Sequence, residues 1–145
     1  MEDISLHILD IAENSIRAEA KNISVTITED MKNDLLTLTI EDDGEGMDIK
    51  TKELALNPFF STKKGKKVGL GLAFLSHSAE EAGGAMKIES EPGRGTKIAA
   101  TFRLGHIDRK PLGNLNETIR CLKVTHPEIN ITFDYVKIDN GGSIW

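Results

Sequence analysis

Two polar side chains near the start of the sequence have the spacing and chemistry of a metal-nucleotide site. Asp10 and Asn14 are four residues apart, so on a helix they lie one turn apart on the same face. An amide oxygen is a suitable ligand for Mg²⁺, and a carboxylate can orient or deprotonate a nucleophile. A solvated helix face has the same pattern, so this segment alone leaves both interpretations open.

A second group is the acidic glycine turn DDGEGM at residues 42–47. Asp42 comes at the end of an apolar strand pattern, and Gly44 and Gly46 allow a sharp turn and the close approach of a flat ligand. A carboxylate here can accept a hydrogen bond from the exocyclic amine of adenine, whereas guanine has an oxygen at that position, which cannot donate. The alternatives are an ordinary acidic turn and a calcium loop, but the full EF-hand spacing is absent.

A third group combines glycines with basic residues. The sequence GLGL at 69–72 opens a helical pattern, where free backbone N–H groups can bind phosphate oxygens. The preceding segment NPFFSTKKGKK has an apolar pair followed by lysines, which is typical of a lid over phosphates. The alternatives are glycines that serve only tight packing and a solvated loop.

Periodicity predicts the elements that hold these groups. Residues 4–20 have helical spacing, residues 83–84 (GG) end a later helix, and PGRG at 92–95 is a hairpin turn. We expect helices at 4–20, 48–56, 70–82 and about 114–125, and strands at 23–28, 35–40, 86–91, 96–104 and about 129–138.

Composition limits the class of protein. The chain has 145 residues, 39% of them hydrophobic, which suits one folded domain. Its net charge of −5 disfavours a broad nucleic-acid surface, and no apolar run is long enough to span a membrane. We therefore expect a cytoplasmic protein that binds neither nucleic acid nor membrane. The single cysteine, Cys121, cannot form an internal disulfide and is expected to be a buried thiol.

Taken in order, the segments ENSIRA, DDGEGM, NPFFSTK, GLGLAF and GRGTKIAATF resemble the N, G1, F and G2 boxes and the closing hairpin of the GHKL ATPases. This superfamily includes sensor histidine kinases, anti-sigma-factor kinases, DNA gyrase B and MutL-type repair proteins. The resemblance covers approximately residues 4–104.

The resemblance implies a Bergerat-type α/β fold, a two-layer sandwich with a mixed sheet and helices on one face. It implies ATP and Mg²⁺ as cofactors, with Asn14 coordinating the metal, Asp42 recognising adenine and Asp10 as the catalytic carboxylate. The expected ATP-binding residues are Asn14, Asp42, Gly44, Gly46, Met47, Phe60, Thr62, Lys63, Gly69, Leu70, Gly71, Leu72 and Thr96. We expect residues 1–105 to form the ATP-binding domain and residues 106–145 a helix-strand extension packed on it.

The sequence departs from the family in two ways. Asp10 stands where hydrolysing members and anti-sigma kinases have Glu, and we expect no phosphoacceptor helix before the domain. The segment HIDRKP at 106–111 echoes an acceptor pattern, but a short match of this kind is mostly chance.

We therefore expect a kinase-type domain that transfers the γ-phosphate of Mg-ATP to a separate partner protein. The alternatives are a nucleotide-gated binding module with little turnover and a hydrolysing ATPase of the gyrase or MutL type. The sequence leaves the oligomeric state open, including a homodimer.

Overall fold

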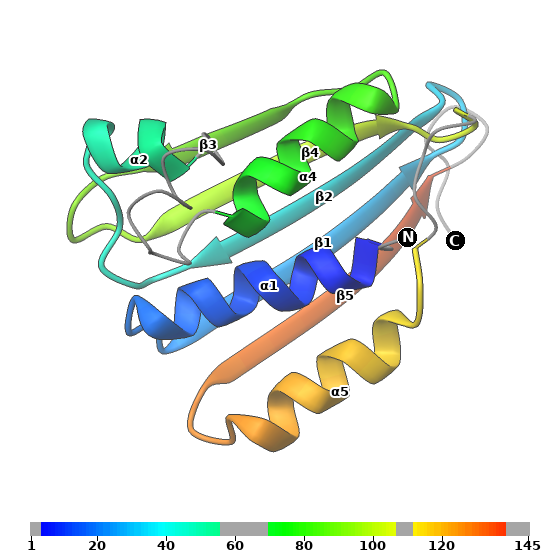
Figure 1. Cartoon of the computed structure of the whole chain (residues 1–145). Helices are drawn as coiled ribbons and strands as arrows, with labels where there is room; N and C mark the ends of the chain where they lie inside the picture. The colour runs from blue at the N-terminus through cyan, green and yellow to red at the C-terminus, as the bar shows by residue number, and fades with distance from the viewer. Residues whose placement is uncertain (1–3, 56–69, 107–111, 139–145) are drawn as a thin grey trace.

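A twisted sheet carries the helices α1, α4 and α5 side by side across one face (Figure 1). The computed structural model describes residues 4–55, 70–106 and 112–138. The elements in these residues are α1 (Ile4–Arg17), β1 (Asn22–Asp30), β2 (Leu35–Asp42), α2 (Ile49–Ala55), α4 (Leu70–Glu81), β3 (Met86–Ser90), β4 (Thr96–Arg103), α5 (Leu115–Thr125) and β5 (Asn130–Ile138).

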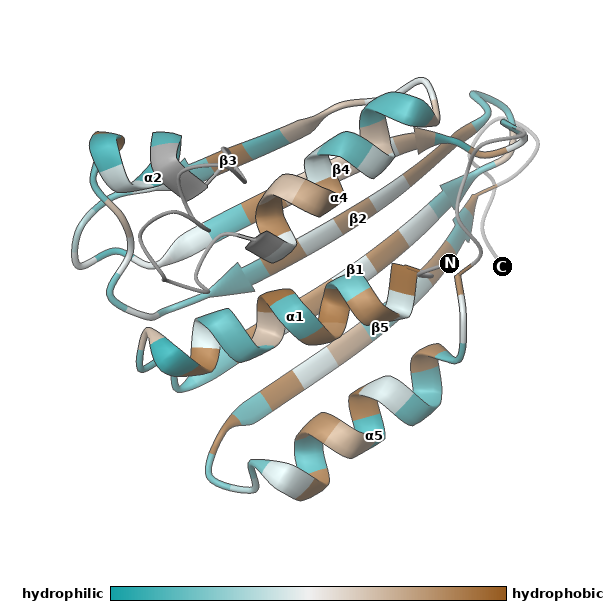
Figure 2. Ribbon diagram, viewed as in Figure 1, coloured by the Kyte–Doolittle hydropathy of each residue, from teal (hydrophilic) through white to brown (hydrophobic). Residues whose placement is uncertain are grey.

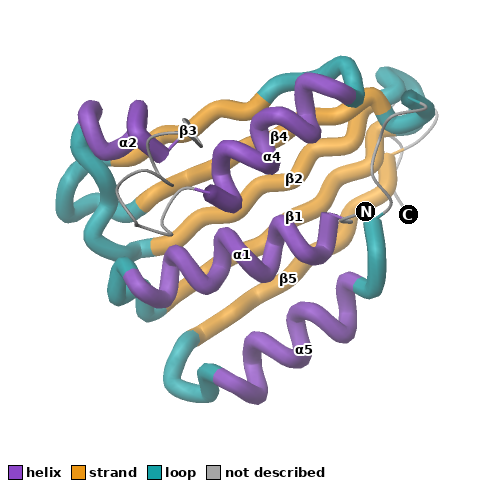
Figure 3. The backbone as a smooth tube through the Cα atoms, viewed as in Figure 1, coloured by secondary structure: helices purple, strands orange, loops and turns teal. Residues whose placement is uncertain are grey.

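The sheet has the strand order β3-β4-β2-β1-β5 (Figure 3). Three of its pairings are antiparallel, and β5 runs parallel to β1. The register places Asp42 opposite Ile23 of β1 on one side and Thr96 of β4 on the other. The predicted two-layer sandwich with a mixed sheet is therefore confirmed, and the acidic turn begins in the middle of the sheet.

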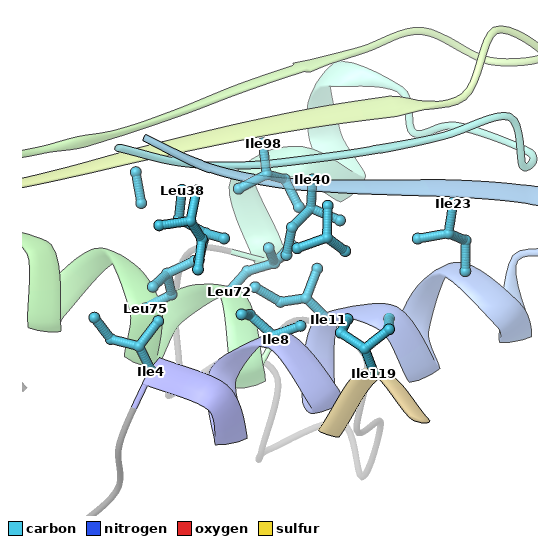
Figure 4. Close-up of a cluster of buried hydrophobic side chains, with 14 of the residues drawn as sticks. Ile4, Ile8, Ile11, Ile23, Leu38, Ile40, Leu72, Leu75, Ile98 and Ile119 are labelled. Carbon is cyan, nitrogen blue, oxygen red and sulfur yellow. The ribbon is translucent and has the colours of Figure 1, made fainter. Parts of the chain in front are cut away.

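The core forms where the helices meet the sheet. Hydrophobic and hydrophilic residues alternate along the strands, as the strand period of two requires (Figure 2). Isoleucines of α1 point toward the apolar face of β1, β2 and β4, and Leu72 and Leu75 of α4 lie beside them (Figure 4). Burying each such side chain stabilises the fold by about 1.5–3 kcal/mol. The core thereby fixes α1, which carries Asp10 and Asn14, against the end of β2.

The predicted elements are all present, with boundaries that differ by a few residues. The largest change is at the end of α1, which stops at Arg17 and not at residue 20. Glu19 has a φ of 64°, and the backbone N–H groups of Glu19 and Ala20 bond to the carbonyls of Ile16 and Ser15. This is a Schellman ending, which satisfies the last helical carbonyls and reverses the chain into β1.

The prediction of a buried thiol at Cys121 was wrong, because its side chain is exposed. α5 buries Ile119 and Leu122 against the sheet. Cys121 follows Ile119 by two residues, about 200° around the helix, and therefore faces away from the core.

The segment 112–138 belongs to the same sheet as the rest of the chain. β5 pairs with β1 over nine residue positions, and α5 contacts α1. The division at residue 105 stays a prediction, and most of the HIDRKP segment lies outside the described residues. Of the helices in the described ranges, none combines the length and apolar character that a membrane crossing requires.

Candidate nucleotide-binding site

The last turn of α1 presents two polar side chains toward the acidic turn. Ser15 is buried, and its hydroxyl donates a hydrogen bond of 2.6 Å to Oδ2 of Asp42. Its neighbour Asn14 is half-buried, and Asn14 Oδ1 accepts a hydrogen bond of 2.5 Å from Nη1 of Arg17. The same turn of helix therefore supports the carboxylate of Asp42 and holds an amide oxygen beside a guanidinium.

Asp42 is held on both of its carboxylate oxygens. Ser15 bonds to Oδ2, and the backbone N–H of Gly44 donates to Oδ1 at 2.9 Å. The carboxylate is half-buried at the end of β2, between β1 and β4. These contacts fix its orientation and show none of the converging carboxylates that a calcium loop requires.

Glycines at two positions let the acidic turn pack against the β3–β4 turn. Gly46 has a φ of 75°, and a Cβ there would lie 2.0 Å from the carbonyl oxygen of Glu91. Gly95 has a φ of 81°, and a Cβ there would lie 2.1 Å from the carbonyl oxygen of Asp42. Any side chain would therefore collide with backbone and adopt an unfavourable conformation.

A hydroxyl pair closes the contact between the two turns. Ser90 Oγ accepts a hydrogen bond from the backbone N–H of Met47 at 2.8 Å and donates to the carbonyl of Gly95 at 3.0 Å. Thr96 Oγ1 lies 2.8 Å from Ser90 Oγ. Since Ser90 has one hydroxyl hydrogen, Thr96 donates to it, and the Thr96 oxygen keeps lone pairs for another donor.

These groups surround a narrow cavity of about 70 Å³. Its walls are mainly apolar, with Asp42, Asn14, Ser15 and Thr96 as the polar groups. The lining residues are Ile11, Asn14, Ser15, Ala18, Asp42, Gly46, Met47, Leu72, Thr96 and Ile98. A slot with apolar walls and one oriented carboxylate has the character of a site for a flat, amine-bearing ring.

Asp10 lies outside this cavity, next to the start of α4. A Cβ built on Gly71 would be 3.0 Å from the Cβ of Asp10, so the two helices approach closely here. The other carboxylate on this part of α1, Glu13, lies 3.4 Å from Nε2 of His126, which precedes β5. Asp10 is therefore the carboxylate of α1 that lies beside α4.

The second aspartate of the turn, Asp43, ties it to the start of β1. Its Oδ1 accepts hydrogen bonds from the backbone N–H groups of Lys21 and Asn22 at 2.8 and 2.9 Å. Its Oδ2 accepts from the Asn22 side chain at 2.7 Å. These bonds, above all the one from the Asn22 side chain, lower the pKa of the Asp43 carboxyl from 3.8 to about 2.

The structure thus brings six of the predicted residues to one cavity, and places two others next to it. The six are Asn14, Asp42, Gly46, Met47, Leu72 and Thr96. Gly44 supports Asp42, and Gly71 adjoins Asp10. Leu70 begins α4, whereas the predicted contacts at Phe60, Thr62, Lys63 and Gly69 lie outside the described residues.

Several residues of the site were not predicted from the sequence. Ser15 and Ser90 are the most important, because they orient Asp42 and join the two turns. Helical spacing could have identified one of them, since Ile11, Ser15 and Ala18 follow at i, i+4 and i+7 and line the cavity together. No comparable signal points to Ser90, which reaches Met47 across 43 positions of sequence.

Within the described residues, the oxygen atoms that could bind a metal at the cavity come from Asn14, Ser15, Asp42 and Thr96. In the ranges that the structure covers, no three His, Cys, Asp or Glu side chains gather as a metal cluster. The Asn14 amide oxygen is one of these oxygen atoms, and in this structure it accepts a hydrogen bond from Arg17. This set suits a cation such as Mg²⁺ that takes its other ligands from phosphates and water.

The family model for histidine kinase-, DNA gyrase B- and HSP90-like ATPases matches residues 2–106. The chain belongs to this family. It is therefore an ATP-binding domain of the histidine kinase-like type, as the five sequence segments predicted.

Two relatives that are similar in sequence are named as kinases. Sporulation kinase C of Bacillus subtilis is 35% identical over 96 residues, which cover 66% of this chain and 22% of that kinase. The sensor histidine kinase ZraS of Salmonella typhi is 32% identical over 89 residues, which cover 61% of this chain and 19% of that kinase. The match thus involves about a fifth of the length of each relative.

A solved structure supports the fold over nearly the whole chain. The Aquifex aeolicus MutL ATPase domain complexed with ADP superimposes with a TM-score of 0.56 at 18% identity. The match covers 93% of this chain and 60% of the MutL chain. It therefore includes most of the segment beyond residue 106 as well as the part that matches the family model.

The two positive-φ glycines of the β3–β4 turn give a matched pair of substitutions. Gly93→Ala should lower the free energy of unfolding by about 1–2 kcal/mol, because its φ is 78° but nothing lies within 4 Å of the added Cβ. Gly95→Ala should lower it by about 2–5 kcal/mol, since the Cβ also meets the Asp42 carbonyl. Urea unfolding of both variants measures the difference, and equal losses would contradict the packing described.

Acid unfolding should report the hydrogen bonds to Asp43. Its pKa is lower in the folded protein than in the unfolded chain, so its stabilising contribution is present above pH 4 and is lost as the pH falls toward 2. The wild-type protein should therefore lose stability more steeply across this range than Asp43→Ala does. Unfolding free energies measured at several pH values test this, and parallel curves would show that the carboxylate is not stabilised by folding.

Proposed function

We propose that the cavity binds the adenine ring of ATP, with the amino group of the base donating to Asp42. The observation that carries this proposal is the double support of the Asp42 carboxylate by Ser15 and Gly44 at the edge of an apolar slot. A carboxylate fixed in this way selects a ring that presents a donor, and it disfavours guanine, which presents an acceptor. The lone pairs of Thr96 offer a second acceptor nearby.

The metal would bind at Asn14. Mg²⁺ favours an oxygen ligand from the protein together with phosphate oxygens and water, and it would neutralise part of the triphosphate charge. Arg17 must then release Asn14 Oδ1, to which it bonds in this structure. Its freed guanidinium suits a phosphate oxygen, because arginine forms strong charge-assisted bonds with phosphates.

The triphosphate would extend from the cavity toward the start of α4. Leu72, in the first turn of this helix, lines the cavity, and Gly71 adjoins Asp10. The first N–H groups of a helix have no intrahelical partner and attract anions. This direction brings the phosphates close to Asp10.

For the reaction, we propose transfer of the γ-phosphate to a side chain of a separate partner protein. The bond from the γ-phosphorus to the bridging oxygen breaks, a bond to the partner's nucleophilic atom forms, and ADP leaves. Asp10 would orient the nucleophile or accept its proton. The similarity to a sporulation kinase and a sensor histidine kinase supports this reaction class.

A nucleotide-gated binding module is the second candidate. The observation in its favour is that the side chain of Asp10 is one methylene shorter than that of Glu. General-base catalysis requires contact with the nucleophile at about 3 Å, and the shorter side chain can fail to reach it. In that case, binding of ATP would change the affinity for a partner, with little turnover.

Calorimetry with Mg-ATP tests the binding site. Asn14→Ala and Asp42→Asn should each weaken binding at least about tenfold. The first removes the proposed ligand of Mg²⁺, and the second removes the negative charge that accepts the hydrogen bond from adenine. Chelation of Mg²⁺ should weaken ATP binding to the wild-type protein but add little to the loss in Asn14→Ala.

The matched control for this experiment is Asn116→Ala, which removes an exposed asparagine from the first turn of α5. It should bind ATP like the wild-type protein. Unchanged affinity for ATP in both Asn14→Ala and Asp42→Asn would contradict the proposed site.

Transfer of labelled γ-phosphate separates the two candidate functions. With a co-purifying partner present, the wild-type protein should label that partner. Asp10→Asn should reduce the rate about 10²–10⁴-fold while leaving ATP affinity nearly unchanged, as expected for a general base. ATP binding without any labelling of the partner would instead favour the nucleotide-gated module.

A further inference from the structure

Three side chains connect the last strand of the sheet to the acidic turn. Asn130, the first residue of β5, donates from Nδ2 to Oδ1 of Asn22 at 3.0 Å. Asn22, the first residue of β1, donates from its own Nδ2 to Oδ2 of Asp43 at 2.7 Å. We call Asn130, Asn22 and Asp43 the amide relay.

The relay acts on the residue that neighbours Asp42. Asp43 receives two more hydrogen bonds, from the backbone N–H groups of Lys21 and Asn22, so its carboxylate is held by three donors. The lowered pKa of Asp43 agrees with a carboxylate held in its charged form. Since Asp42 precedes it directly in the chain, a shift of Asp43 would move the backbone from which the Asp42 side chain projects.

The middle of the turn is also held by two backbone contacts. The N–H of Glu45 donates to the carbonyl of Ala18 at 2.9 Å, and the N–H of Gly93 donates to the carbonyl of Glu45 at 2.6 Å. These contacts fix the middle of the turn to α1 and to the β3–β4 turn. The amide relay acts on Asp43, next to Asp42, and adds a side-chain connection to the backbone N–H groups that also bond to Asp43.

Strand pairing does not need the relay. The backbone ladder already joins β1 to β5 from Asn22 to Asp30, and β1 to β2 from Ile23 to Asp30. The three side chains of the relay are exposed. Removing them should therefore disturb the position of the turn more than it lowers the free energy of unfolding.

We propose that the amide relay positions Asp42 for base recognition, so that the strand β5 sets the selectivity of the site for adenine. Asp43, Asn22 and Asn130 are positioning residues in this scheme, and none of them touches the nucleotide. The inference rests on the proposed function, because it assumes that Asp42 receives the adenine amino group.

The test is the ratio of the dissociation constants for GTP and ATP, measured by competition on the full chain. Loss of fold reduces the binding of both nucleotides equally and leaves this ratio unchanged. A displaced Asp42 weakens the binding of ATP more than that of GTP, so it lowers the ratio. Asp43→Ala should lower the ratio roughly tenfold. Asn130→Ala leaves the three bonds to Asp43 in place and should lower it roughly two- to fourfold.

Asp30→Ala is a matched control. The Asp30 carboxylate also accepts hydrogen bonds from an asparagine: the backbone N–H and the side-chain amide of Asn33 both donate to it. It lies at the other end of β1, roughly 26 Å from Asn22 at 3.3 Å per residue. Asp30→Ala should leave the selectivity ratio at the wild-type value.

The outcomes are distinguishable. If the wild-type protein binds ATP and the ratio is unchanged in both Asp43→Ala and Asn130→Ala, the relay proposal is overturned and the proposed site stands. If the wild-type protein does not prefer ATP to GTP, the proposed function fails and the relay proposal fails with it. Should Asp43→Ala not fold, Asn130→Ala and Asn22→Ala, which leave Asp43 and its backbone donors intact, decide the question.

Discussion

The hydrogen bond from the Ser15 hydroxyl to the Asp42 carboxylate joins the two halves of the candidate site. One partner lies on α1 and the other at the end of β2, and the bond is possible because the core holds that helix against the sheet. Ile8 and Ile11 are buried on the face of α1 that meets the strands. The apolar packing therefore determines where Asn14 and Asp10 lie relative to the acidic turn.

Close backbone packing is the second constraint. The turn at 42–47 and the turn at 91–95 approach so closely that Gly46 and Gly95 have no room for a Cβ. Ser90 and Thr96 satisfy the polar groups that this approach buries. Gly46, Met47 and Thr96, which lie at this approach, line part of the cavity, so the packing of the two turns shapes it.

The segment 112–138 connects with the acidic turn without lining the cavity. β5 completes the sheet beside β1, and His126 reaches Glu13 on α1. Because β1 lies between β5 and β2, the start of β5 is close enough to the acidic turn for a chain of three side chains to span the distance. This part of the protein has no motif in its sequence that indicates such a connection, and only its position in the sheet reveals it.

The sequence by itself determined the element types, because apolar residues recur with period 3.6 in α1 and period 2 in β1 and β2. It also indicated several residues that line the cavity, among them Asn14 and Asp42, since those motifs are local. It could not determine that Ser15 supports Asp42, that Ser90 joins two turns, or that Asn130 connects with Asp43. Each of these contacts joins residues far apart in the chain, and only strand order and register decide which distant residues meet. The exposure of Cys121 was decided in the same way, by the face of α5 that packs on the sheet.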